Sequence, residues 1–142
     1  MKKLLVLFCS IVFAMNVDAQ KPNPVKWTFT AIKKSDKQYE VVASATIDAP
    51  WHMYSQFVSG GPIPTTFTFS KNPLIQLAGK TKEKGKLQKM YDKNFKTELS
   101  FFSDKVDFIQ TVNLKVASKT NLVGMVEYSI CNDDRCLPPA KV

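Results

Sequence analysis

Residues 128–139 read Tyr128-Ser129-Ile130-Cys131-Asn132-Asp133-Asp134-Arg135-Cys136-Leu137-Pro138-Pro139. Two cysteines flank four polar residues typical of a tight turn, an alternating apolar run precedes them, and a proline pair follows. The pattern predicts a β-hairpin with a disulfide at its tip. Across two antiparallel strands we expect the Cα atoms of Cys131 and Cys136 to lie about 4.5–5.5 Å apart, a separation that a disulfide can bridge.

Such a disulfide closes a small ring, and two interpretations of it are open. For a ring of about six residues, loop closure contributes only about 2 kcal/mol to stability. The bond is either a permanent clip of the hairpin or a dithiol that opens and closes in thiol–disulfide exchange, which a short, exposed and easily reduced bond suits. Arg135 favours a thiolate at the adjacent Cys136, whereas Asp133 and Asp134 oppose its ionisation. The sequence alone therefore does not determine whether the pKa of the thiol is raised or lowered.

The run Cys-x4-Cys-Leu-Pro-Pro at 131–139 resembles the active-site hairpin of the DsbD amino-terminal domain family, whose members are periplasmic immunoglobulin-like domains that relay electrons. The resemblance covers nearly all of the chain after residue 19. It implies that Cys136 meets the partner and that Cys131 is the resolving thiol. The turn between the cysteines is one residue shorter than in the better-known hairpin of the family. The sequence also ends soon after Cys136, where the family usually continues through another strand.

The segment Trp51-His52-Met53-Tyr54-Ser55 resembles the part of this family that brings aromatic side chains beside the disulfide. His52 and Tyr54 occupy the positions of the two aromatic residues; Tyr54 keeps the pattern and His52 departs from it. His52 is either an acid–base group or an ordinary packed or surface residue. Tyr54 either donates a hydrogen bond to a sulfur or is a plain core tyrosine.

The segment 91–96 resembles the family's short loop in which an aromatic residue caps the cysteines and swings away when a partner docks. Phe95 is the best match for the capping residue, Asp92 precedes it, and Tyr91 is its rival. An aromatic lid of this kind would exclude other thiols and oxidants and would lose few contacts on opening. The alternative is that Phe95 is a core residue entering a strand at 96–102.

The first 19 residues have the features of a secretory signal peptide. A basic start is followed by an apolar run over residues 4–15 and by small residues before Gln20, so we expect cleavage after Ala19 and export to the periplasm. The run is shorter than the about 20 residues of a membrane span, which predicts no direct membrane insertion. A lipid anchor on Cys9 is disfavoured because a bulky phenylalanine precedes it. Residues 20–142 then form one domain with only two cysteines.

Charge and composition exclude several other functions. The chain carries a net charge of +8, with lysines concentrated between residues 80 and 96. A basic run near aromatic residues can bind nucleic acid, but export argues against that partner, and we expect a solvated lysine-rich edge. The chain has one histidine and no C-x2-C pair, so neither a metal site nor another cofactor is predicted. A hydrolase would need a nucleophile constellation that the sequence lacks.

The hydrophobic pattern is that of strands, and no stretch shows a helical period over three turns. Short alternating runs separated by Gly and Pro predict an all-β fold, an immunoglobulin-like β-sandwich with a cysteine-bearing hairpin. In the longest run we expect Val106, Phe108, Val112, Leu114 and Val116 to share one buried face. The expected strands are 25–31, 39–47, 51–54, 65–69, 106–116 and 122–130, with weaker ones at 74–77 and 86–91.

Together these features predict a thiol:disulfide oxidoreductase of the protein-disulfide reductase type, acting as a monomer. Cys131 and Cys136 would take electrons from a separate membrane thiol reductase and pass them to exported thioredoxin-like proteins, as in cytochrome c biogenesis. The alternative is a secreted immunoglobulin-like binding module with a static disulfide. That alternative does not explain why the disulfide closes a short hairpin, since a longer loop would gain more stability.

Overall fold

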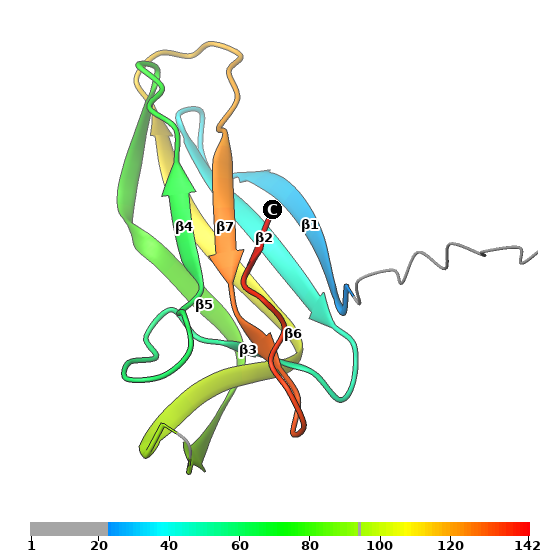
Figure 1. The fold of residues 1–142 in the computed structure, drawn as a ribbon. Helices are drawn as coiled ribbons and strands as arrows, with labels where there is room; N and C mark the ends of the chain where they lie inside the picture. Colours follow the sequence, from blue (N-terminus) through cyan, green and yellow to red (C-terminus); the bar gives the residue numbers. More distant parts are fainter. Residues whose placement is uncertain (1–22, 94) are drawn as a thin grey trace, which may run out of the picture.

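A computed structural model describes residues 23–93 and 95–142 as two packed β-sheets (Figure 1). The predicted signal peptide lies outside the described residues. Within them no helix is present, which confirms the all-β prediction. It follows that this part of the chain holds no helix with the length and apolar character to cross a membrane.

The larger sheet is built around one long strand, β6. Its strand order is β1-β2-β6-β3-β8, and β5 pairs with the other edge of β6. The second half of β6 pairs with β2, and Phe101 and Phe102 near its start pair with β3. The strands of this sheet are β1 (Val25–Lys33), β2 (Gln38–Ile47), β3 (His52–Tyr54), β5 (Ile75–Asp92), β6 (Thr97–Leu114) and β8 (Ile130–Cys131).

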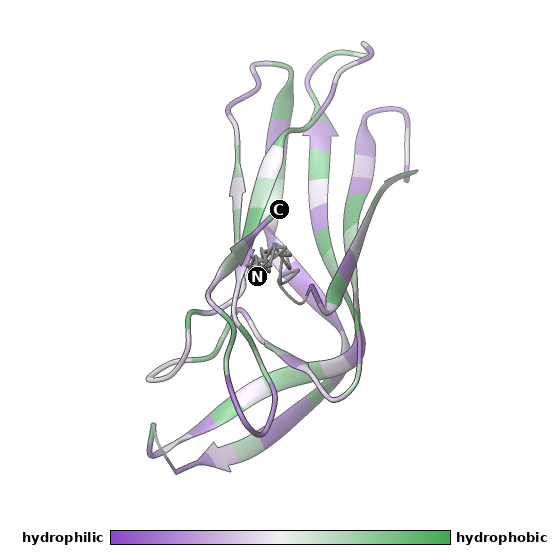
Figure 2. Cartoon of the chain, turned by 45° about the vertical axis from the view of Figure 1, so that its right-hand side comes forward, coloured by the Kyte–Doolittle hydropathy of each residue, from purple (hydrophilic) through white to green (hydrophobic). Residues whose placement is uncertain are grey.

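The smaller sheet covers one face of the larger one. Its strand order is β4-β7-β9, all antiparallel, with β4 (Thr66–Phe69), β7 (Gly124–Tyr128) and β9 (Ala140–Lys141). Apolar and polar residues alternate along much of the strands, as the colours of Figure 2 show. Buried apolar residues of both sheets pack together in one core. The ring of Phe108 on β6 lies 5.0 Å from that of Phe67 on β4 and 5.9 Å from that of Trp27 on β1, measured between centroids.

The buried face of β6 differs from the prediction at two positions. Val106, Phe108 and Val112 are buried as expected, but β6 ends at Leu114 and Val116 is 48% exposed beyond it. Gln110, a polar residue absent from the predicted face, is 3% exposed. Its Oε1 accepts a hydrogen bond from Thr81 Oγ1 at 2.9 Å, so the buried amide is paired.

The long β5–β6 hairpin was not anticipated as a unit. The sequence predicted two weak strands, at 74–77 and 86–91, where the structure has one strand of 18 residues. Strand β6 likewise begins at Thr97, well before the predicted start at 106. The intervening residues of β5 are polar, and they are held by the ladder to β6 and not by an apolar pattern of their own.

Two register shifts interrupt this hairpin. They fall between Ala78 and Lys82 and between Gly85 and Leu87. At the second one, a Cβ on Gly85 would lie 3.0 Å from the carbonyl oxygen of Lys105 and 3.2 Å from the ring of Phe102. Only glycine fits this approach of two strands without displacing the backbone of β6.

Strand β5 is an edge strand and carries the cluster of lysines. Its lysines are exposed, as predicted for a solvated basic edge, and Lys89 Nζ lies 2.8 Å from Glu98 Oε1 across the hairpin. A row of lysines on an unpaired edge opposes pairing with a second chain. The exposed lysines of β5 are Lys80, Lys82, Lys84, Lys86 and Lys89.

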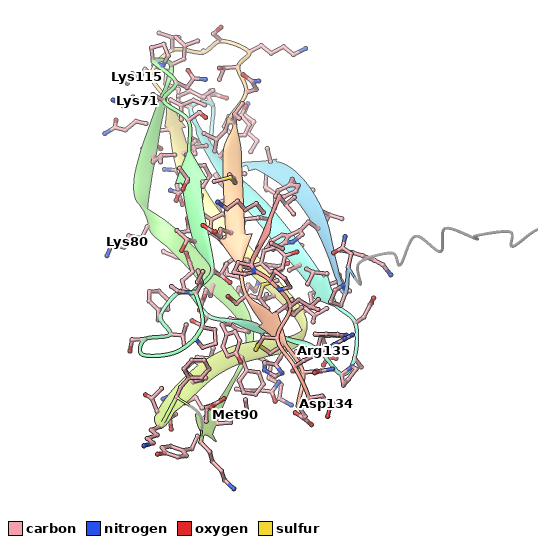
Figure 3. The ribbon with its side chains drawn as sticks, viewed as in Figure 1. Lys71, Lys80, Met90, Lys115, Asp134 and Arg135 are labelled. Atoms are coloured by element: carbon pink, nitrogen blue, oxygen red, sulfur yellow. A yellow bond between two sulfur atoms is a disulfide. The ribbon has the colours of Figure 1, made fainter. Side chains whose placement is uncertain are left out.

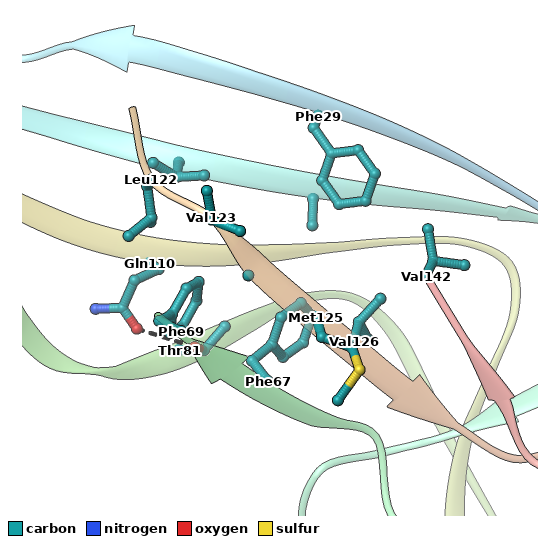
Figure 4. A pocket seen from close by; sticks show the side chains of 13 residues that line it. Phe29, Phe67, Phe69, Thr81, Gln110, Leu122, Val123, Met125, Val126 and Val142 are labelled. Atoms are coloured by element: carbon teal, nitrogen blue, oxygen red, sulfur yellow. Dashed lines mark hydrogen bonds between the residues drawn. The ribbon is translucent and has the colours of Figure 1, made fainter. Parts of the chain in front are cut away.

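An apolar cavity of about 340 Å³ is lined by residues of both sheets (Figure 4). Phe29 of β1 and Phe67 and Phe69 of β4 form part of its wall, and Met125 of β7 closes another part. The only polar side chains in its lining are Gln110 and Thr81, which bond to each other. No cysteine, histidine or charged side chain lines it, so we place the chemistry elsewhere.

Candidate active site

The predicted cysteine hairpin is present. Cys131 and Cys136 are joined by a disulfide and also form an isolated antiparallel bridge, and Leu137 N donates to Ile130 O at 3.0 Å. The turn between the cysteines is closed by Asn132 N, which donates to Arg135 O at 2.9 Å.

The side chain of Asn132 fixes the rest of this turn. Its Oδ1 accepts hydrogen bonds from the backbone N of Asp134 at 3.0 Å and of Arg135 at 2.8 Å, the pattern that makes asparagine a frequent turn residue. The Cα atoms of Cys131 and Cys136 are 4.0 Å apart, closer than the 4.5–5.5 Å expected for an ordinary strand pair. The reason is that the four-residue turn draws the two ends together through these three bonds.

The two cysteines differ in exposure. Cys131 is 2% exposed, whereas Cys136, on the outer arm of the hairpin, is exposed to solvent. Cys131 packs in a small cluster with Tyr54, Val58 and Leu99, and the half-buried Phe101 lies against the same cluster. We call these five residues the cysteine cluster. In the oxidised form, a molecule approaching from solvent therefore reaches the sulfur of Cys136 first.

Strand β3 places His52 and Tyr54 beside the disulfide, as the sequence predicted. His52 pairs with Cys131 and Met53 pairs with Ile130 in the antiparallel register. Because successive side chains of a strand point to opposite faces, His52 and Tyr54 lie on the face of Cys131. Met53 and Ile130 point the other way, into the core between the two sheets.

His52 and Tyr54 are in direct contact. The Nε2 of His52 lies 3.2 Å from the hydroxyl of Tyr54, and their rings meet edge to face with centroids 5.4 Å apart. The ring of Phe101 lies 4.8 Å from that of His52 on the same face. Phe101 was missed by sequence reasoning, although the Phe101-Phe102 pair was a usable signal. In a strand, two adjacent large residues serve opposite faces, and here Phe102 enters the main core.

Burial sets the protonation of this pair. Loss of solvent lowers the pKa of His52, and the carboxylates of Asp133 and Asp92 oppose that shift. Loss of solvent raises the pKa of Tyr54, and Asp92 raises it further. At neutral pH the imidazole is therefore neutral and the phenol keeps its proton.

Glu83 of β5 anchors the chain as it leaves β3. Its Oε2 accepts a hydrogen bond from Ser55 Oγ at 2.8 Å, and its Oε1 accepts one from Gln56 N at 2.6 Å. Ser55 is fully buried, so the carboxylate satisfies a hydroxyl that water does not reach. The anchored segment leads to Val58 of the cysteine cluster. Glu83 was not predicted, because only the tertiary fold brings β5 to this segment.

The predicted cap residues lie at the tip of the β5–β6 hairpin. Asp92 pairs with Thr97 and Met90 pairs with Leu99, which puts Asp92 and Met90 on the face of the cysteine cluster. Tyr91 points to the opposite face and is 66% exposed, and Phe95 in the turn is 44% exposed. The backbone N of Phe95 donates to Asp92 Oδ1 at 3.1 Å.

Asp92 is thus brought into the site, whereas capping by Phe95 stays a prediction. Met90 lies on the same face of the hairpin as Asp92, but it was not predicted from the sequence as a residue near the cysteines. In Figure 3, Met90 lies at the same end of the molecule as Asp134 and Arg135 of the cysteine turn.

Arg135 extends the site on its exposed side. Its guanidinium carbon lies 5.9 Å from the centre of the Trp51 ring, within the range of a cation–π contact. The contact holds a positive charge next to Cys136 in the chain. Among residues 23–93 and 95–142, His, Cys, Asp and Glu form no group of three that could hold a metal ion.

The fold and the site together define an immunoglobulin-like β-sandwich domain of the thiol–disulfide exchange class. Residues 16–142 match the family described as thiol:disulfide interchange protein DsbD, N-terminal, and the chain belongs to this family. The match confirms the resemblance stated from the cysteine hairpin. No protein with a curated description matches the sequence.

Two solved structures from Neisseria meningitidis resemble this one. The DsbD N-terminal domain in its reduced form has a TM-score of 0.51 at 13% identity, covering 80% of this chain and 78% of its own. The complex between the DsbD N-terminal and the PilB N-terminal domains gives a TM-score of 0.54 at 12% identity, covering 88% of this chain and 85% of the other. At such low identity these similarities show the shared fold alone.

Proposed function

We propose that the chain is a periplasmic electron relay. In its dithiol form it reduces disulfides of exported thioredoxin-like proteins, and a membrane thiol reductase restores the dithiol. The family assigns it to thiol–disulfide exchange. The observation that carries the proposal is the unequal exposure of Cys131 and Cys136, because an exchange site needs one sulfur within reach and one held back.

The partner class is supported by one of the related structures. The DsbD N-terminal domain of Neisseria meningitidis forms a complex with a PilB N-terminal domain. We take the partner of this chain to be a thioredoxin-like domain of the same kind. Cytochrome c biogenesis is one pathway in which such a relay would serve.

The exchange proceeds in two balanced steps. The Cys136 thiolate attacks one sulfur of the partner disulfide, a mixed disulfide forms, and the other partner sulfur leaves as a thiolate that takes up a proton. The Cys131 thiolate then attacks Cys136 Sγ, which restores the Cys131–Cys136 bond and releases the second partner thiolate. Two electrons pass from this chain to the partner.

The surrounding residues have distinct proposed roles. Arg135 stabilises the Cys136 thiolate, and Tyr54 and His52 border Cys131. The negative charge of Asp92 raises the pKa of Tyr54 and opposes the lowering of the pKa of His52. Phe95, or Tyr91 in its place, would shield the sulfurs until a partner displaces it. We also propose that residues 1–19 are removed and that residues 20–142 act as a monomeric domain.

The reduction potential of the pair tests the proposal. The domain is equilibrated with glutathione redox buffers and its free thiols are counted. A value above about −250 mV is expected for an exchangeable pair. A value below about −300 mV, with no thiols released in mild reductant, would instead identify a static clip and favour a binding module.

The role of each cysteine is tested with oxidised glutathione as the probe. In the C131S variant the exposed Cys136 should form a glutathione adduct at least about tenfold faster than Cys131 does in the C136S variant, since thiol access limits the attack. Mass spectrometry follows both adducts over time. Equal rates, or faster reaction of the C136S variant, would reverse the assignment.

A further inference from the structure

We propose that His52 is the general base that takes the proton of Cys131 when Cys131 resolves the mixed disulfide at Cys136. The inference rests on the proposed exchange function and assigns a chemical role to the residue at which the chain departs from the aromatic pattern. The two residues are direct partners across the β3–β8 ladder. Side chains directly opposite in an antiparallel pair share a face, with their Cβ atoms about 4.5–5.5 Å apart.

Cys131 needs such a base because of where it lies. A thiol attacks only as the thiolate, and Cys131 is 2% exposed, so bulk water has little access to its proton. Apolar surroundings also disfavour ionisation of a thiol, and Val58, Leu99 and Phe101 supply such surroundings. His52 lies directly opposite Cys131 in the register, and its neutral imidazole can accept a proton.

The contacts of His52 hold its ring in a fixed orientation. Phe101 packs against the ring, and Tyr54 occupies the Nε2 side at 3.2 Å. In the tautomer that carries its proton on Nε2, that N–H donates to the Tyr54 oxygen, and Nδ1 keeps the free lone pair that the proposed proton transfer requires. Tyr54 is thereby a positioning residue for the base.

The charges around His52 suit a group that gains and loses a proton in each cycle. Three titratable groups from three elements face it: Tyr54 on β3, Asp92 on β5 and Asp133 in the cysteine turn. Burial lowers the pKa of His52, so the base is free at neutral pH, and the two carboxylates stabilise the imidazolium once it forms.

The step balances within the site. The thiol of Cys131 gives its proton to His52, and the resulting thiolate attacks Cys136 Sγ. The Cys131–Cys136 bond forms while the bond from Cys136 to the partner sulfur breaks, and the electron pair leaves with that sulfur. The imidazolium returns the proton to the departing thiolate, so His52 ends the cycle neutral.

The test uses 5,5′-dithiobis(2-nitrobenzoate) as the partner disulfide and stopped-flow absorbance as the readout. Reduced protein releases one thionitrobenzoate when Cys136 attacks and a second when Cys131 resolves the adduct, in a phase independent of reagent concentration. The variants are H52F, which keeps a ring against Phe101, and H52Q, which is smaller and polar. M53L is the matched control, because Met53 is the next residue of β3 and faces the main core.

We expect H52F and H52Q to slow the second phase at least about tenfold at pH 7, within the range typical of a lost general base. The deficit should shrink toward about pH 8.5, where a thiol ionises without help. The first phase should stay within about twofold in both variants, and M53L should match the wild type in both phases. In the wild type alone, the second phase should reach its plateau by about pH 6.5, the ordinary pKa of histidine.

Three results would overturn the inference: an unchanged second phase in the variants, a deficit equal at every pH, or a wild-type rate that keeps rising to about pH 8.5 like that of an unassisted thiol. The wild-type profile decides the matter even if a variant fails to fold. A wild type that releases only one thionitrobenzoate would instead refute the exchange function itself, so the two failures are distinguishable.

Discussion

The main core between the sheets and the cysteine cluster lie on opposite faces of the same three strands. Met53, Phe102 and Ile130 point into the main core, while the neighbouring residues Tyr54, Phe101 and Cys131 form part of the cysteine cluster. The main core is closed by the smaller sheet. The cysteine cluster is instead covered by the loop that follows β3 and by the tip of the β5–β6 hairpin. We therefore expect stability to reside mainly on the face of the main core and the proposed chemistry on the face of the cysteine cluster, so that a change on one face has little effect on the other.

The largest effect should come from breaking the main core. F108A removes a ring that is 1% exposed and packs against Trp27, Phe67 and Phe102, and we expect it to lower the free energy of unfolding by about 3–5 kcal/mol. Urea denaturation measures the loss. The reduction potential of the variant, measured where it is folded, should match the wild type; a clear change would mean that the two faces are coupled.

A second prediction concerns the anchor of the loop that covers the cysteine cluster. E83A removes both acceptors that hold Ser55 and Gln56, and it should cost about 1.5–3 kcal/mol because the buried Ser55 hydroxyl and the Gln56 amide lose a charged acceptor. E98A is the matched control: its exposed ion pair with Lys89 should contribute no more than about 1 kcal/mol. Equal losses in the two variants would show that the anchor is not needed.

Opening the disulfide should be milder than breaking the main core. Its ring is small, so reduction should lower the free energy of unfolding by only about 2 kcal/mol. Denaturation of the oxidised and reduced forms in parallel gives this number. A loss as large as that of F108A would make the bond a structural staple and weaken the case for exchange.

The smallest effect is expected on the outer side of the site. R135A removes the contact with the Trp51 ring and should cost about 0.5–1 kcal/mol. The same variant should react more slowly with oxidised glutathione at Cys136, because a positive charge beside the sulfur favours the thiolate. An unchanged rate would limit Arg135 to packing.

How far the sequence could go depended on whether a residue's neighbours were close in the chain. The Cys131–Cys136 pairing is local, the strand around Phe29 alternates clearly, and the strand around Val42 is rich in β-branched and small residues, so these features were predictable. The position of His52 and Tyr54 beside Cys131 was available only through the family resemblance. Nothing in the chain near residue 83 signals that this carboxylate will meet Ser55.

Two errors have a physical origin of the same kind. The polar middle of β5 was not recognised because its pairing with β6, and not its own pattern, makes it a strand. Gln110 was left out of the core because polar residues usually face solvent, and its burial is explained largely by its hydrogen bonds to Thr81 and to the backbone of the neighbouring strand β5. In both cases the deciding partner is far away in the sequence.

The register shift at Gly85 and Leu87 divides the β5–β6 ladder into a part that borders the main core and a part that borders the cysteine cluster. Opening that starts at the hairpin tip should stop at this interruption, because the ladder is not continuous across it. Backbone amides of residues 97–102 should therefore exchange with deuterium sooner than those of residues 106–112. We therefore expect the end of the molecule that carries the cysteine cluster to open locally while the sandwich stays closed.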